Sequence, residues 1–150
     1  MQVSDIMERD VKTVSADDSF ADAARVLREY RISSVIVGEG GAPRGIVTER
    51  DFVSLVADGL DPATTKVGDR MTTELATVEP RTDIAEAARI MAERRIRHLP
   101  VVDRGSLAGI ISIRDLTSWA VAEQTGGHEL PDMERSTAAL TAAVQADTVS

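Results

Sequence analysis

Apolar side chains recur with helical spacing in two stretches of the chain, residues 20–27 and 84–91. In both stretches they occupy positions i, i+3, i+4 and i+7, a stripe that covers one face of an amphipathic helix. A potential N-cap residue precedes each stretch, Ser19 in the first and Asp83 in the second. An acidic residue lies three positions after each cap residue, Asp22 and Glu86 respectively. The pattern predicts two capped helices.

Two short runs rich in β-branched residues follow each of these helices. Their glycine-containing connections have lengths that suit hairpins or tight strand turns. The runs are 33–37 and 45–48 in the first half of the chain, and 98–102 and 108–112 in the second. A short opening strand is predicted around Thr13 or Thr77, and a last helix over 50–57 or 114–124. Each half therefore has the predicted order β-α-β-β-α.

The two halves are copies of one another. A shift of 64 residues places 3–54 on 67–118 without an insertion, and 19 of these 52 positions are identical. Such self-similarity indicates a tandem repeat. The predicted division is 1–58 for the first repeat, 59–65 for a linker, 66–124 for the second repeat and 125–150 for a tail. Residues 133–145 of the tail form either a weak Ala-rich packed helix or part of a mobile terminus, and both alternatives are open.

Composition excludes several classes of protein. The chain has 17 Lys and Arg against 25 Asp and Glu, a formal net charge of −8 that argues against nucleic-acid or anionic-membrane binding. It has no cysteine, which excludes disulfides and cysteine chemistry. It has neither an apolar run of about 18 residues nor a secretory signal at its start, so a cytoplasmic protein is expected.

The charge is unevenly distributed between the repeats. Residues 1–64 hold seven basic and twelve acidic side chains, whereas residues 65–124 hold nine of each. The neutral second repeat is therefore the better host for an anion. None of the common catalytic motifs is present, and His98 and His128 lie too far apart in sequence to suggest a metal site. Neither an enzyme nor a required cofactor or metal is expected.

The repeated motifs resemble the CBS (cystathionine β-synthase) domain. They are D-x-M at 5–7 and 69–71, TVEP at 77–80, RHLPVVD at 97–103, GIVTERD at 45–51 and GIISIRD at 109–115. Each motif alone is weak, but their order and spacing over residues 3–124 are specific. The resemblance implies an α/β (α+β) fold in which two repeats pack about a pseudo-two-fold axis into a disc with two clefts. It also implies regulatory binding of AMP, ADP, ATP or S-adenosylmethionine, or in some members NAD or cyclic dinucleotides.

GIVTERD and GIISIRD each place a hydroxyl and a carboxylate three residues apart where a strand runs into a helix. The candidate ligand residues are Thr48, Arg50 and Asp51 in the first repeat, and Ser112, Arg114 and Asp115 in the second. A carboxylate can accept hydrogen bonds from both ribose hydroxyls, and a helix N-terminus with an arginine favours phosphate. The same spacing is a helix-capping box, and the two roles can coexist.

Arg97 and His98 are further candidates, because the resemblance implies that residues at this place reach ligand phosphates. The alternative is a solvated basic helix end, which is equally open. The first repeat has Ser33 and Ser34 at these positions, so Ser34 is a weaker, uncharged candidate. The two clefts should therefore differ in affinity, and one of them could be empty.

The resemblance also places an apolar slot for adenine in each cleft. The predicted slots are Val11, Thr13, Val35 and Ile46 in one cleft, and Leu75, Thr77, Leu99 and Ile110 in the other. For each apolar residue, a place in the ordinary core is the stronger alternative.

The last helices carry more apolar side chains than a two-repeat disc can bury, namely Phe52, Leu55, Val56, Leu116, Trp119 and Ala120. Some of them should form a flat apolar face that pairs two copies of the chain. The sequence therefore predicts a homodimeric, stand-alone regulatory module, an energy sensor that binds an adenosyl ligand and modulates a partner protein. The alternative is an interaction scaffold with degenerate clefts.

Overall fold

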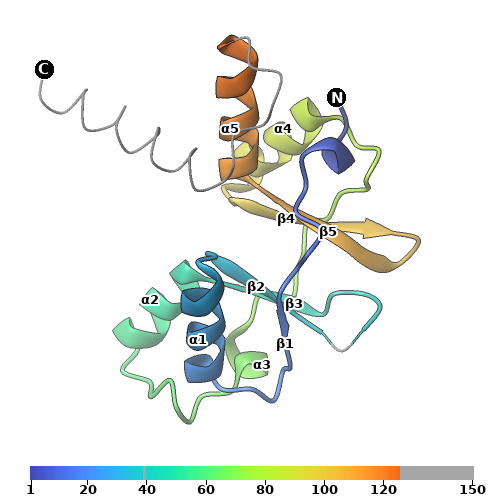
Figure 1. The fold of residues 1–150 in the computed structure, drawn as a ribbon. Coiled ribbons are helices and arrows are strands. Elements are labelled where there is room, and N and C mark those ends of the chain that lie inside the picture. Colours follow the sequence, from blue (N-terminus) through green and yellow to red (C-terminus); the bar gives the residue numbers. More distant parts are fainter. Residues whose placement is uncertain (39, 126–150) are drawn as a thin grey trace, which may run out of the picture.

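The computed structural model describes residues 1–38 and 40–125, and both halves of the chain have the same layers (Figure 1). In each half, helices cover the outer side of a small sheet. The first half contains β1 (Thr13–Val14), α1 (Phe20–Tyr30), β2 (Ser34–Val37), β3 (Gly45–Thr48) and α2 (Glu49–Ala57). The second contains α4 (Ile84–Arg94), β4 (His98–Asp103), β5 (Ser106–Ser112) and α5 (Ile113–Gln124). The predicted α/β fold is confirmed, whereas His128 and the tail residues 133–145 lie outside the described residues.

The first long helix of each repeat begins at the predicted cap. At α1, the Ser19 N–H donates to the Asp22 carboxylate, and the Asp22 N–H donates to the Ser19 hydroxyl. At α4, the Asp83 carboxylate accepts from the N–H of Ala85, but Glu86 pairs with an arginine one turn on instead of closing the box. Both caps are thus confirmed, and the reciprocal box is present only at α1.

The two sheets differ at the strand that opens each repeat. The first sheet has the order β1-β2-β3, with β1 parallel to β2 and β2 antiparallel to β3. The second contains only the antiparallel pair β4 and β5, and the strand predicted around Thr77 is reduced to a bridge between Val78 and Val101. Ile36 donates its N–H to the Lys12 carbonyl, but Pro100 stands at the equivalent place and has no N–H to donate.

Two short helical segments, η1 (Val3–Asp5) and α3 (Val67–Arg70), were not predicted. Each opens one repeat in sequence but packs against the other repeat, as Figure 1 shows for the blue turn near the N-terminus and for α3. Val3, which is fully buried, and Met7 belong to the core of the second repeat, and Val67 belongs to that of the first. The repeats therefore exchange their first turns.

Backbone pairing continues this exchange beyond the short helices. Glu8 and Ile110 share two hydrogen bonds of 2.9 Å, and Thr72 and Ile46 share two of 3.0 Å. The start of each repeat is thus paired with the last strand of the other repeat. The chain then crosses back to the sheet of its own repeat, and we call residues 8–12 and 72–76 the crossing segments.

Each crossing passes directly over a glycine. A Cβ atom on Gly45 would lie 2.5 Å from the Met71 sulfur, and one on Gly109 would lie 2.8 Å from both the Met7 sulfur and the Glu8 carbonyl oxygen. These distances are too short for a side chain. The methionine of each D-x-M motif therefore packs on the glycine that begins the Gly-Ile motif of the other repeat.

Gly109→Ala should lower the free energy of unfolding by about 1–3 kcal/mol, because the added methyl group must displace the Glu8 backbone. Gly38→Ala is the matched control, since its Cβ would meet its nearest neighbour at an ordinary 3.5 Å. Urea unfolding followed by circular dichroism measures both variants. Equal stability of the two would contradict the close crossing.

Candidate functional site

A cavity of about 890 Å³, here called the central cavity, lies between the two repeats. Its volume is within the range of about 300–1,000 Å³ that is typical of ligand pockets. Strand ends, the first turns of α2 and α5, and both crossing segments line it. Thirteen of the predicted residues are among its lining: Val11, Ser34, Ile46, Thr48, Arg50, Asp51, Leu75, Arg97, His98, Ile110, Ser112, Arg114 and Asp115. Both candidate sites therefore open into one space.

Four residues predicted for the adenine slots lie elsewhere. Thr13 and Thr77 are exposed and do not line the central cavity. On β1 side chains alternate between faces, and Val14 is the one directed into the core. Val35 and Leu99 are fully buried in the two cores. The alternative of ordinary core packing is therefore correct for these last two.

Each repeat presents one carboxylate to the cavity through the same capping arrangement. Oδ2 of Asp51 accepts a hydrogen bond of 2.8 Å from the Thr48 N–H, and Oδ2 of Asp115 accepts one of 2.7 Å from the Ser112 N–H. Within residues 1–38 and 40–125, Oδ1 of neither aspartate has a hydrogen-bond partner. One oxygen thus orients the side chain, and the other is left to accept hydrogen bonds from a ligand.

The environment of Asp115 includes a residue from the other repeat. Burial raises the pKa of Asp115, and the negative charge of Glu8 adds to this effect. Hydrogen bonds from Ser112 and the charge of Arg114 act in the opposite direction. Because Glu8 lies on a crossing segment, the exchange of first turns brings it to the carboxylate of the second repeat.

His98 links the two repeats inside the cavity. Its Nε2 atom and the hydroxyl of Ser33 share a hydrogen bond of 2.7 Å. Burial, together with the positive charges of Arg114 and Arg97, lowers the pKa of His98 to about 4. The imidazole is therefore neutral at pH 7, and the positive potential around it comes from the arginines.

Two arginines that line the cavity were missed by the sequence prediction. Arg31 directly follows α1 and Arg95 directly follows α4, with φ values of 53° and 54° in the left-handed region. This conformation costs a residue with a side chain about 1–2 kcal/mol. The sequence did carry a signal for these two arginines, because the pair Arg-Ile follows the first long helix in both repeats, as Arg31-Ile32 and Arg95-Ile96. Lys12 was also missed; its ammonium lies 4.2 Å from the centroid of the Tyr30 ring, and both residues line the cavity.

Two further kinds of site are absent from residues 1–38 and 40–125. None of the helices there is both long and apolar enough to cross a lipid bilayer. The same residues contain no group of three or more His, Cys, Asp or Glu side chains that could hold a metal ion.

Comparison with known proteins identifies the family to which both repeats belong. A model of the CBS domain family matches residues 3–58 and 67–122. The CBS domain-containing protein YhcV of Bacillus subtilis is 32% identical over 132 residues, which are 87% of this chain and 94% of that protein. A CBS-domain-containing protein of Agrobacterium tumefaciens has a solved structure that is 34% identical, with a TM-score of 0.75 over 80% of this chain and 99% of that one. A CBS domain protein of Pyrobaculum aerophilum, solved in complex with AMP, is 27% identical, with a TM-score of 0.72 over 77% of this chain and 90% of its own.

The depressed pKa of His98 predicts a loss of stability in acid. Between pH 6.5 and about 4 the unfolded state binds a proton at this residue and the folded state does not, so stability falls as the pH falls. From pH 7 to pH 5, the free energy of unfolding should drop by about 1–2 kcal/mol more in the wild type than in His98→Gln. Urea unfolding at the two pH values tests this. Asp115 titrates in both proteins, so identical pH dependence would contradict the assignment to His98.

Proposed function

Because the chain belongs to the CBS domain family and carries two copies of the domain, we propose that it is a regulatory module for an adenosine-containing ligand. AMP, ADP, ATP or S-adenosylmethionine binds in the central cavity and changes how the module acts on a partner protein. The observation that carries this proposal is the pair of carboxylates, Asp51 and Asp115, held at the cavity by capping hydrogen bonds and each with one oxygen available.

The available carboxylate oxygens suit a ribose. Vicinal 2′- and 3′-hydroxyls donate two hydrogen bonds, and an ionised carboxylate accepts both at about twice the strength of a neutral acceptor. Asp51 and Asp115 cannot rotate away without losing the bonds to Thr48 and Ser112. A preorganised acceptor of this kind lowers the entropic cost of binding.

Two arginines at helix N-termini suit a phosphate. Arg50 and Arg114 are the second residues of α2 and α5. At this position the helix dipole disfavours a positive charge by about 0.3–1 kcal/mol. Both line the central cavity. A phosphate bound beside such a terminus is stabilised by the backbone N–H groups and by the guanidinium together.

The phosphate sites of the two repeats differ in charge. Arg97 and Arg114 both act on His98, so the positive potential is concentrated at that point of the cavity. The first repeat offers the hydroxyls of Ser33 and Ser34 in the equivalent place. A polyphosphate therefore binds with its charged end toward Arg97, and a ligand with fewer charges is favoured at the serine side.

Apolar residues of the cavity suit an adenine ring. Ile46 and Ile110 lie on the last strands of the two sheets, and Val11 and Leu75 lie on the crossing segments. Their apolar surface, together with the backbone groups of the strand ends, offers the stacking surface and hydrogen bonds that a base needs. The AMP complex of the Pyrobaculum relative supports the same ligand class.

The surface of the last helices supports a homodimer. Val56 on α2 is 72% exposed and Val121 on α5 is 41% exposed, and neither residue lines the central cavity. Leu55 is fully buried, so only part of the apolar set predicted from the sequence remains outside. Contact between two copies through this face removes it from water, and a ligand-dependent change in the cavity reaches the partner through α2 and α5.

Calorimetric titration with AMP, ATP and S-adenosylmethionine should give saturable binding to the wild type. Asp51→Ala and Asp115→Ala should each weaken binding by about tenfold or more, because two charge-assisted hydrogen bonds to the ribose are lost. Asp22→Ala is the matched control: it removes the same capping box from α1, but Asp22 does not line the cavity. Its affinity should equal that of the wild type.

The same titrations separate the regulatory module from a scaffold with degenerate clefts. A ligand present at 100 times its dissociation constant should raise the free energy of unfolding by about 2.7 kcal/mol. The ligand-binding proposal is wrong if no adenosine ligand, at millimolar concentration, gives heat of binding or raises the free energy of unfolding.

Val56→Asp should shift the protein from dimer to monomer, because it places a charge in the apolar contact. Sedimentation velocity over a range of concentrations measures the shift. Ser54→Asp adds the same charge to an exposed position of α2 and serves as the control. A wild type that stays monomeric at high concentration would refute the homodimer.

A further inference from the structure

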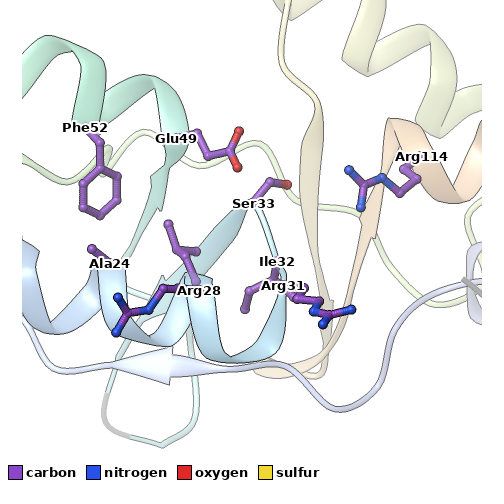
Figure 2. Close-up of a pocket in the computed structure, with 9 residues that line it drawn as sticks. Ala24, Arg28, Arg31, Ile32, Ser33, Glu49, Phe52 and Arg114 are labelled. Carbon is purple, nitrogen blue, oxygen red and sulfur yellow. The ribbon is translucent and has the colours of Figure 1, made fainter. Parts of the chain in front are cut away.

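A second cavity, of about 490 Å³, lies at α1 and α2 of the first repeat, and we call it the outer pocket (Figure 2). It is large enough for a small organic ligand. Its apolar lining consists of Ala24, Leu27, Ile32 and Phe52. No part of the proposed adenosyl site requires this apolar surface.

Phe52 gives the outer pocket a fixed aromatic wall. Its ring meets the fully buried Phe20 edge-on, with the centroids 5.2 Å apart and an interplanar angle of 77°. Ala24 on α1 lies near the ring in Figure 2 and is too small to fill the space beside it. The pocket therefore accommodates an apolar group from a ligand.

The charges around the outer pocket are mainly positive. They belong to Arg28, Arg31, Arg114 and Glu49. Arg114 comes from the second repeat, on the opposite side of the view from Phe52 (Figure 2). An excess of cations around an apolar space, in a chain of net charge −8, favours a ligand with an anionic head.

The repeat itself provides an internal comparison. At the equivalent positions, the second repeat has Ala92 for Arg28, Ile113 for Glu49 and Leu116 for Phe52. Since both repeats have the same fold without sharing these side chains, the fold does not require them. The aromatic wall and the cation on α1 are specific to the first repeat.

We propose that the outer pocket binds an amphipathic carboxylate, an alkyl or aryl acid. The apolar body of the acid lies against Phe52, and its carboxylate is attracted by the positive charges of Arg28 and Arg114 around the pocket. The acid does not need a bound adenosyl ligand in order to bind.

Arg114 also couples the outer pocket to the central cavity. Five residues line both spaces: Arg31, Ile32, Ser33, Glu49 and Arg114. A phosphate that draws the Arg114 guanidinium into the central cavity removes a cation from the outer pocket. The two ligands therefore weaken each other's binding, and linkage makes the effect reciprocal. This coupling rests on the proposed function.

Calorimetric titration of the full chain with octanoate and with 1-octanol tests the outer pocket. Octanoate should bind about tenfold more tightly than the alcohol, because only the acid meets the arginines. Arg28→Ala should remove most of that difference. Arg25→Ala, an exposed arginine of the same helix that lines neither cavity, should leave it unchanged. Phe52→Leu should weaken both probes alike, since it changes only the apolar wall.

Equal affinity for acid and alcohol, or an Arg28→Ala variant that binds like the wild type, would overturn the proposal. So would an affinity for octanoate that falls as the protein concentration rises, because the second copy of the proposed homodimer, which packs on α2 and α5, would then cover the pocket.

AMP added before octanoate tests the coupling. It should weaken octanoate binding in the wild type, and it should leave octanoate binding unchanged in Arg114→Gln at an AMP concentration that calorimetry shows to saturate that variant. Independent binding of the two ligands to the wild type would disprove the shared role of Arg114. If AMP gives no heat while octanoate binds, the adenosyl function fails and the outer pocket stands; the reverse result removes only the outer pocket.

Discussion

The reciprocal packing of two methionines over two glycines determines the rest of the architecture. Met7 crosses Gly109 and Met71 crosses Gly45 so closely that no side chain fits at either glycine. The backbone pairs made beside them hold the start of each repeat on the last strand of the other repeat. The crossing segments that follow then line the space between the repeats. The cavity therefore exists because neither repeat completes its own core.

Within that frame, the capping boxes combine structural and chemical roles in the same atoms. The bond from the Thr48 or Ser112 N–H to an aspartate stabilises the start of a helix and also fixes a carboxylate at the cavity. Arg50 and Arg114, placed against the helix dipole, reduce that stability slightly. A residue that lines a cavity and lowers the stability of its own helix is typical of a binding site.

Most of the local structure could be predicted from the sequence, because helical stripes, caps and strand runs depend on near neighbours. The cap at Ser19 and the strand ending at Thr48 are examples. The exchange of first turns could not be predicted, since it joins segments of different repeats that are not neighbours in sequence, Glu8 with Ile110 and Thr72 with Ile46. The loss of the strand around Thr77 depends on the N–H that Pro100 lacks, a partner that becomes visible only once the strands are paired.

The exchange of first turns also has a consequence for the origin of such a chain. A polypeptide with one repeat would leave the groove over its glycine empty and its own first turn without a core. Two separate copies could each supply the turn that the other lacks, in a symmetric swapped dimer. Joining the copies end to end converts that encounter into an intramolecular one and raises the effective concentration of the missing turn. Once joined, the two halves need not keep identical side chains, and Arg28, which aligns with Ala92 of the second repeat, is one such difference.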